Sequence, residues 1–138
     1  MGNRTFTILK PDSVRNGNFG KIISRLESEG FKILGLKKVS LSPKQAEGFY
    51  AVHRERPFFS GLVEYMTSGP VYVAALERSD AVAHLRKVMG ATDPAKADAG
   101  TIRKDFGESI EQNAIHGSDS DENANIEIAF FFSTTELL

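Results

Sequence analysis

Strand-forming segments and segments of helical periodicity alternate along the whole chain, and this alternation constrains the fold more than any other feature of the sequence. Residues 4–10, 31–41 and 71–77 are predicted strands, and a short fourth strand is expected over residues 114–116. A proline follows the first strand. Because a residue before proline favours extended backbone, Lys10 is expected at the end of that strand.

The segments between these strands carry apolar stripes and end signals typical of amphipathic helices. Residues 19–26 place apolar side chains at i, i+3, i+4 and i+7, and residues 42–45 form a capping box with proline at the first helical position. Further helices are expected over residues 59–66, from Ser79 or Asp80 to Gly90, and from about Asp121. The predicted order is β-α-β-(α-α)-β-α-β-α, with helices long enough to cover one face of a four-stranded sheet. We therefore expect an α+β fold, a ferredoxin-like sandwich whose four-stranded antiparallel sheet has helices packed on it.

The helix that ends at Gly90 and the segment after it form a candidate functional region. On a helical wheel Val82, Leu85 and Met89 form the inner arc, Arg86 lies on its flank, and His84 faces away. Residues 91–100 mix Pro, Gly, Ala and Asp without apolar periodicity, which predicts a loop. Long loops in compact domains are often functional.

The length and composition favour one domain that spans residues 1–138, because 41% of the 138 residues are hydrophobic and suffice for a single core. No stretch approaches the roughly 20 consecutive apolar residues of a membrane span, and the first residues lack the apolar core of a signal peptide. We therefore expect a cytoplasmic protein with no membrane partner. The chain has no cysteine, which excludes disulfides, thiolate metal sites and thiol catalysis.

The charges are distributed unevenly. Residues 1–104 carry all 17 Lys and Arg against 10 acidic residues, a formal charge of +7, whereas residues 105–127 carry seven acidic residues and no Lys or Arg. The isoelectric point near 6.3 gives no prior for a strong nucleic-acid binder, so no obligatory nucleic-acid partner is expected. A local basic patch in the first hundred residues would suit small anionic ligands as well as nucleic acid.

His116 stands between an apolar run and a turn in the stretch NAIHGSDS, residues 113–120. Further along, Glu127 projects into the apolar arc of the last predicted helix, where an ionised carboxylate needs a partner. His116 is the attractive candidate, and a salt bridge to a Lys or Arg is the alternative. A carboxylate on one ring nitrogen fixes the tautomer and leaves the other nitrogen free, as in a nucleophile or general base. A lone histidine on an apolar element is otherwise structural, which is the interpretation kept for His53 and His84.

A metal site is the third interpretation of His116, together with Asp119 and Asp121. This set offers one nitrogen and hard oxygen ligands without the multi-histidine spacing of zinc sites, so a permanent transition-metal centre is not indicated. The two aspartates would otherwise cap the last helix.

Four segments, TFTILKPD, HRERPFFSGL, GATDPAKADAGTIRKDFG and NAIHGSDS, occur in this order and together extend over most of the chain. In combination they closely resemble the nucleoside diphosphate kinases, and the histidine motif is highly specific for that family. The resemblance implies a transferase that moves the γ-phosphoryl group of a nucleoside triphosphate to a nucleoside diphosphate. It implies a ping-pong route through a phosphohistidine, with His116 as the nucleophile.

The resemblance also assigns roles to individual residues. Glu127 matches the acid that orients the histidine ring, Ser118 the hydroxyl beside it, and Tyr50 a ring packed nearby. Lys10 and Asn113 match residues that hold the sugar and its 3′-hydroxyl, and Lys10 also counts among the catalytic groups. The remaining matches bind phosphate or base: Arg86, Thr92 and Arg103 contact phosphates, Phe58 and Ile110 form an apolar clamp on the base, and Leu62 lies alongside.

The cofactor and partners follow from the same resemblance. Mg²⁺ is expected to be held mainly by the nucleotide phosphates, with Asp119 as a candidate protein contact. The family implies a homo-oligomer, a tetramer or a hexamer. The alternative from another functional class is a ferredoxin-like nucleic-acid or protein-binding module without turnover, but the sequence lacks the aromatic signature of such RNA-binding modules. A catalytically silent member of the family is disfavoured because His116 and its matched partners are present.

Overall fold

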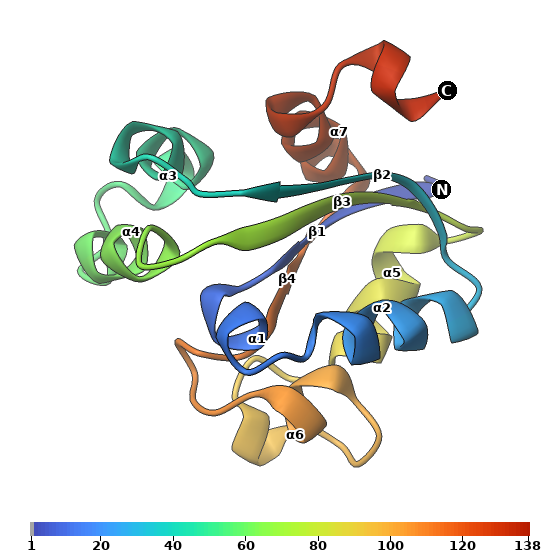
Figure 1. Ribbon diagram of the computed structural model, residues 1–138, viewed down its shortest axis with the longest axis horizontal. Helices are drawn as coiled ribbons and strands as arrows, with labels where there is room; N and C mark the ends of the chain where they lie inside the picture. Colours follow the sequence, from blue (N-terminus) through green and yellow to red (C-terminus); the bar gives the residue numbers. More distant parts are fainter. Residues whose placement is uncertain (1) are drawn as a thin grey trace.

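A computed structural model describes residues 2–138 and contains one four-stranded antiparallel sheet (Figure 1). The strand order across the sheet is β2-β3-β1-β4. The strands are β1 (Arg4–Leu9), β2 (Lys32–Val39), β3 (Val71–Glu77) and β4 (Ile115–Gly117). This arrangement confirms the predicted ferredoxin-like α+β fold and the positions of all four predicted strands.

Strand β1 lies in the interior of the sheet, between β3 and β4, and every residue in it except Arg4 is buried. It pairs with β3 along its whole length and with β4 from Thr7 to Leu9. In this register His116 of β4 is opposite Ile8. Lys10 follows β1 in extended backbone, with φ of −72° and ψ of 166°, as the proline after it predicts.

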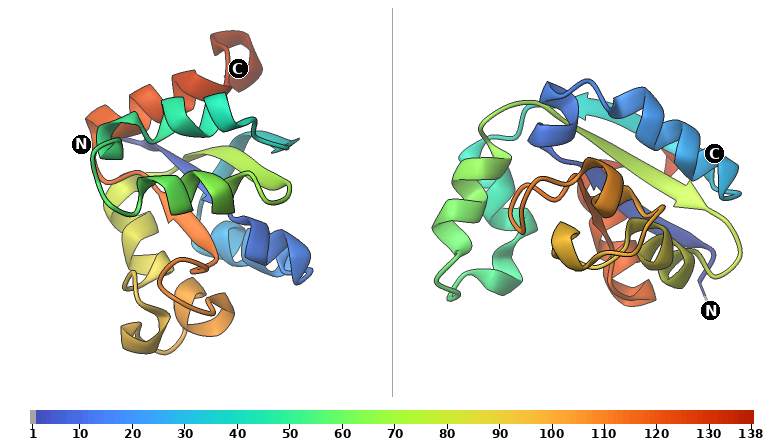
Figure 2. Two further views of the ribbon diagram at one scale, coloured as in Figure 1. Left: turned by 90° about the vertical axis from the view of Figure 1, so that its left-hand side faces the viewer. Right: turned by 90° about the horizontal axis from the view of Figure 1, so that it is seen from below.

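Helices cover both faces of the sheet, so the expectation that they cover one face is wrong (Figures 1 and 2). Successive strand residues point to opposite faces, and β1 has buried apolar side chains on both: Phe6 and Ile8 belong to one hydrophobic cluster and Leu9 to the other. The cluster around Leu9 contains residues of α2 (Phe19–Ser28) and α5 (Ala81–Met89). The opposite cluster contains residues of α3 (Pro43–Phe49), α4 (Phe59–Met66) and α7 (Asp121–Phe131).

Several short elements escape prediction from sequence. They are the helices α1 (Pro11–Arg15) and α6 (Ile102–Phe106) and the 3₁₀ turns η1 (Ala51–His53), η2 (Pro94–Lys96) and η3 (Thr134–Leu137). Elements this short show no readable apolar period, and short helices depend on tertiary contacts for their stability. Among residues 2–138, no helix is both long and apolar enough to cross a membrane.

The helix ends agree with the sequence in part. The predicted capping box of α3 is present, with Ser42 Oγ accepting from Gln45 N–H at 3.1 Å. The prediction that Asp119 and Asp121 cap α7 is wrong, because Ser120 occupies the cap and its Oγ accepts from the Asn123 N–H at 3.0 Å.

His84 does not face away from the protein, contrary to the helical-wheel prediction. Its Nε2 lies 2.9 Å from Glu29 Oε1, and its ring centroid lies 5.8 Å from that of Phe31. The residues just after α2 therefore pack against the side of α5 that a helical wheel places away from the apolar arc.

Substitution of Gly35 by alanine tests the packing between β2 and the C-terminal segment, and substitution of Gly20 in α2 is the comparison. Gly35 lies at an irregularity in β2, and an added Cβ would lie 2.9 Å from the Phe132 ring, so Gly35→Ala is expected to lower the free energy of unfolding by about 1–3 kcal/mol. Gly20 in α2 has no other atom within 4 Å of an added Cβ, so Gly20→Ala should raise that free energy by up to about 1 kcal/mol. Urea denaturation measures both effects, and a neutral result for Gly35→Ala would contradict the close packing.

Candidate active site

Strand β4 carries His116 at the edge of the sheet, directly against β1. Thr7 Oγ1 donates to the His116 carbonyl oxygen at 2.7 Å, and the Ser118 N–H donates to the Phe6 carbonyl oxygen at 3.1 Å. The His116 ring packs near three aromatic rings. Their centroids lie at 6.3 Å for Phe6, 5.5 Å for Phe49 and 6.5 Å for Tyr50. The backbone and one side of the imidazole are thus fixed by the core.

Glu127 reaches from α7 to the imidazole ring, as the sequence predicts. His116 Nε2 lies 2.9 Å from Glu127 Oε1, and Ser118 Oγ donates to the same oxygen at 2.7 Å. A carboxylate only accepts, so Nε2 carries the ring proton and Nδ1 of the neutral ring keeps a free lone pair. Within residues 2–138, no Lys or Arg forms an ion pair with Glu127, which excludes the alternative partner there.

Lys10 brings a buried ammonium group to the end of β1. Its side chain is only 8% exposed, and Nζ donates to the Glu111 carbonyl oxygen at 3.5 Å. Burial lowers the pKa of Lys10 to about 8, and the positive charge of Arg103 adds to this effect, while the carboxylates of Asp12 and Glu111 oppose it. The charge of Lys10 is therefore easily lost in the free protein.

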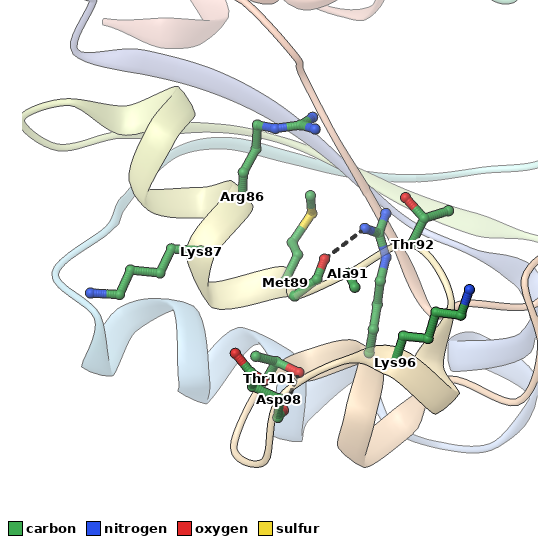
Figure 3. Close-up of a pocket in the computed structure, with 10 residues that line it drawn as sticks. Arg86, Lys87, Met89, Ala91, Thr92, Lys96, Asp98 and Thr101 are labelled. Atoms are coloured by element: carbon green, nitrogen blue, oxygen red, sulfur yellow. Dashed lines mark hydrogen bonds between the residues drawn. The ribbon is translucent and has the colours of Figure 1, made fainter.

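Arg86, Thr92 and Arg103 line one cavity of about 380 Å³ at the C-terminal end of α5. Figure 3 shows Arg86 on this helix, Thr92 on the segment that follows it and Lys96 at the end of η2. Burial lowers the pKa of Arg103 to about 10, and the charge of Arg86 contributes. Because Arg103 stays protonated at neutral pH, the cavity has a concentrated positive charge suited to an anion.

The cations of this region are not neutralised by carboxylates. Arg103 donates from Nη1 to the Gly90 carbonyl oxygen at 3.0 Å and from Nη2 to the Ile115 carbonyl oxygen at 2.9 Å. In the described part of the chain, neither Lys10, Arg86 nor Arg103 forms a salt bridge. Since Ile115 directly precedes His116, the bond from Arg103 also connects the cavity to β4.

Asn113 and Tyr50 each have a buried polar atom without a partner among residues 2–138. Asn113 Nδ2 donates to the Thr92 carbonyl oxygen at 3.0 Å, whereas its Oδ1 has no partner. The Tyr50 hydroxyl also has none, and burial together with the negative charge of Glu127 raises the pKa of Tyr50 far above its ordinary value. A buried polar atom without a partner is costly, so a ligand that supplies one would be stabilised here.

Phe58 and Ile110 are exposed apolar side chains, at 52% and 62%, while Leu62 is half-buried on α4. An added Cβ at Gly61 would lie 3.8 Å from Glu111 Oε2, which places the first turn of α4 beside the loop that carries Ile110. The two predicted clamp residues thus come from adjacent segments at the protein surface.

His116, Asp119 and Asp121, the metal alternative considered from the sequence, do not form a metal site. Asp119 Oδ1 accepts from the Asn123 side chain at 2.6 Å, and Asp121 Oδ2 accepts from the Gly2 N–H at 2.8 Å. Across residues 2–138, no group of three His, Cys, Asp or Glu side chains is arranged to hold a metal ion.

A buried group beneath this site was not predicted from the sequence. Asp12 and Ser13 follow Lys10 in α1, and both are fully buried. Asp12 contacts Tyr65 of α4 and the N–H of Ala114. The position of Asp12 after a strand and a proline does not by itself predict burial.

Comparison with known proteins agrees with this geometry. The family model described as "Nucleoside diphosphate kinase" matches residues 3–137. A protein of that name from Geotalea daltonii is 58% identical over 98% of both chains. One from Campylobacter jejuni subsp. jejuni is 60% identical over 97% of this chain and 98% of its own length.

Solved structures are similar over the same length. The nucleoside diphosphate kinase of Aquifex aeolicus has a TM-score of 0.96 at 47% identity, with 99% of each chain covered. The halophilic nucleoside diphosphate kinase of Halobacterium salinarum, solved in complex with CDP, has a TM-score of 0.94 at 44% identity, covering 100% of this chain and 92% of that one. The chain therefore belongs to the nucleoside diphosphate kinases, a family of nucleotide-binding phosphotransferases.

Proposed function

We propose that this protein transfers the γ-phosphoryl group of a nucleoside triphosphate to a nucleoside diphosphate by a ping-pong mechanism through phosphorylated His116. The observation that carries the proposal is the contact between His116 Nε2 and Glu127, 2.9 Å long, which leaves Nδ1 free as a nucleophile. The relative from Halobacterium salinarum was solved in complex with CDP, which supports a nucleotide as the ligand.

Each half of the reaction exchanges one bond to phosphorus for another. Nδ1 of His116 attacks the γ-phosphorus, the bond to the β–γ bridging oxygen breaks, and the nucleoside diphosphate leaves. In the second half, a terminal β-phosphate oxygen of another nucleoside diphosphate attacks the same phosphorus, and the bond to Nδ1 breaks. The proton on Nε2 stays hydrogen bonded to Glu127, whose charge stabilises the positive character of the phosphorylated ring.

Positive charge around the phosphates supplies the rest of the catalysis. Phosphoryl transfer needs mainly in-line positioning and stabilisation of charge on the phosphoryl oxygens. Arg86 and Arg103 line the cavity with Thr92, and among residues 2–138 no carboxylate pairs with either guanidinium group, so both can bind phosphate. Lys10 and the unpartnered Oδ1 of Asn113 would hold the sugar and its 3′-hydroxyl.

The family implies a divalent metal ion, and we propose Mg²⁺ bound to the nucleotide phosphates, where it would neutralise phosphate charge. No dedicated protein cage is needed for this mode of binding, which fits the donor set of residues 2–138. Asp119 is the candidate protein contact, since Oδ2 of its carboxylate is not used in its bond to Asn123.

The base would lie between Phe58 and Ile110, with Leu62 alongside. Stacking on apolar side chains tolerates every base, so we propose broad specificity for purine and pyrimidine nucleotides. We also propose a homo-oligomer, a tetramer or a hexamer, as the family resemblance implies.

Transfer of label from [γ-³²P]ATP tests the proposal directly. With Mg²⁺ present, the label should appear on His116 and pass to added GDP or CDP, and His116→Ala should abolish both steps because it removes the nucleophile. Peptide mass mapping under alkaline conditions, which preserve phosphohistidine, locates the label. His84→Ala is the matched control and should still be labelled, because His84 contacts Glu29 away from this site.

The competing interpretation is a binding module without turnover. It predicts bound nucleotide without label on any histidine. Turnover retained by His116→Ala would exclude His116 from the mechanism instead.

Substitution of Glu127 by glutamine separates orientation from nucleophilicity. The amide keeps the size of the side chain but removes the charge that orients and stabilises the ring, so kcat should fall by about 10- to 100-fold. The expected loss is smaller than that of His116→Ala. Steady-state kinetics measure it, and a kcat equal to that of the unmodified protein would show that Glu127 does not orient His116.

The pH dependence of kcat/KM reports the charge of Lys10 in the free enzyme. Because the pKa of Lys10 is lowered to about 8, its ammonium is present below this pH and is lost above it, so kcat/KM should fall as the pH rises through about 8. Lys10→Arg should remove this fall, since a guanidinium stays charged there. A profile that stays flat from pH 7 to 9 in the unmodified protein would contradict the role of Lys10.

A further inference from the structure

The backbone turns sharply at Ala114, two residues before His116. Ala114 has φ of 76°, in the left-handed region that residues other than glycine rarely adopt. The Ile115 N–H donates across this residue to the Asn113 carbonyl oxygen at 2.9 Å, which closes a three-residue turn. Such a turn persists only where its surroundings hold it.

Both peptide groups of Ala114 are held by the segment that begins at Lys10. The Ala114 N–H donates to Asp12 Oδ2 at 3.0 Å. The Ala114 carbonyl oxygen accepts from the Lys10 N–H at 2.9 Å and from Ser13 Oγ at 2.8 Å. Hydrogen bonds thus hold the turn at Ala114 against residues 10–13, the segment that follows β1.

The carboxylate of Asp12 is itself fixed from the other side. The Tyr65 hydroxyl donates to Asp12 Oδ1 and accepts from the Asp12 N–H at 3.0 Å. Asp12 is fully buried, and Tyr65 is nearly so. A buried carboxyl group is costly unless it is hydrogen bonded, and both partners of the Asp12 side chain, the Tyr65 hydroxyl and the Ala114 N–H, lie outside α1.

We propose that Asp12 is a positioning residue for phosphoryl transfer, which holds the turn at Ala114 and thereby sets Asn113 and His116 in place relative to Lys10. This inference rests on the proposed function. It adds a residue that touches neither nucleotide nor His116, and that acts through the backbone between two groups of the site. A displacement of about 1 Å at a reacting group can cost about 100-fold in rate, so small shifts of this turn matter.

Asp12 has a second effect that a purely structural residue would not have. Three charged groups besides burial determine the pKa of Lys10: Arg103, Asp12 and Glu111. The carboxylate of Asp12 raises the pKa of Lys10, against burial and Arg103. Removal of its charge should therefore lower the pKa of Lys10 below about 8.

The test compares Asp12→Asn with Tyr65→Phe in the full-length protein. Asp12→Asn removes the charge but keeps an oxygen that can accept from the Ala114 N–H, and Tyr65→Phe removes one hydrogen bond to the carboxylate but keeps the charge. For Asp12→Asn, we expect the single-turnover rate of His116 phosphorylation by ATP and Mg²⁺ to fall about tenfold. We also expect the alkaline fall of kcat/KM to move to lower pH. In Tyr65→Phe, that fall should stay near pH 8.

Each outcome decides the proposal. A folded Asp12→Asn variant that keeps both the phosphorylation rate and the pH profile would overturn it, even if urea denaturation shows lower stability. If Asp12→Asn does not fold, Ser13→Ala decides, because it removes only one bond to the Ala114 carbonyl oxygen. A rate reduced about threefold would support the proposal, since one of three bonds to the turn is lost, and an unchanged rate would overturn it.

The unmodified protein separates this inference from the proposed function. If it is not labelled on His116, the proposed function fails and the inference fails with it. If it is labelled and the Asp12 variant behaves identically, only the positioning role of Asp12 fails.

Discussion

The antiparallel pairing of β4 with β1 is the contact on which the rest of the site depends. It places His116 opposite Ile8, two residues from Lys10, although the two strands are more than a hundred residues apart in sequence. Strand β4 has only three residues, so its own ladder is short. Contacts from α1, α6 and α7 also hold β4 and the residue before it, through Asp12, Arg103 and Glu127.

The charges of the site differ from those of the surface in how they are satisfied. On the surface, Arg25 pairs with Asp105 and Lys37 with Glu136. In the site, Lys10 and Arg103 donate to backbone carbonyl oxygens instead. Carbonyl oxygens orient a cation without cancelling its charge, so these groups stay available to an anion. The lowered pKa values of both residues reflect the cost of this arrangement, which a bound phosphate would relieve.

Most of the regular structure could be predicted from local patterns. The strands, the long helices and the capping box at Ser42 are where the sequence predicts them, because apolar period and capping chemistry are local properties. The sequence predicts helices that cover one face of the sheet, whereas they cover both, because the apolar residues of β1 lie on both faces and the helices that contact them come from different parts of the chain. The five-residue helices α1 and α6 are too short to show a period.

The candidate site, like the fold, was predictable from the sequence only in part. The sequence by itself determined that Glu127 needs a polar partner in an apolar arc, that His116 is a candidate for it, and, through its resemblance to one family, which residues are candidates for the site. Only the tertiary structure decided that Nε2 is the nitrogen held by the carboxylate, that Arg103 is oriented by carbonyl oxygens, and that Asp12 is buried beneath the turn at Ala114. The reason is physical: a local pattern specifies which face of an element is buried, whereas hydrogen bonds between distant segments, and the burial that shifts a pKa, exist only once those segments have packed together.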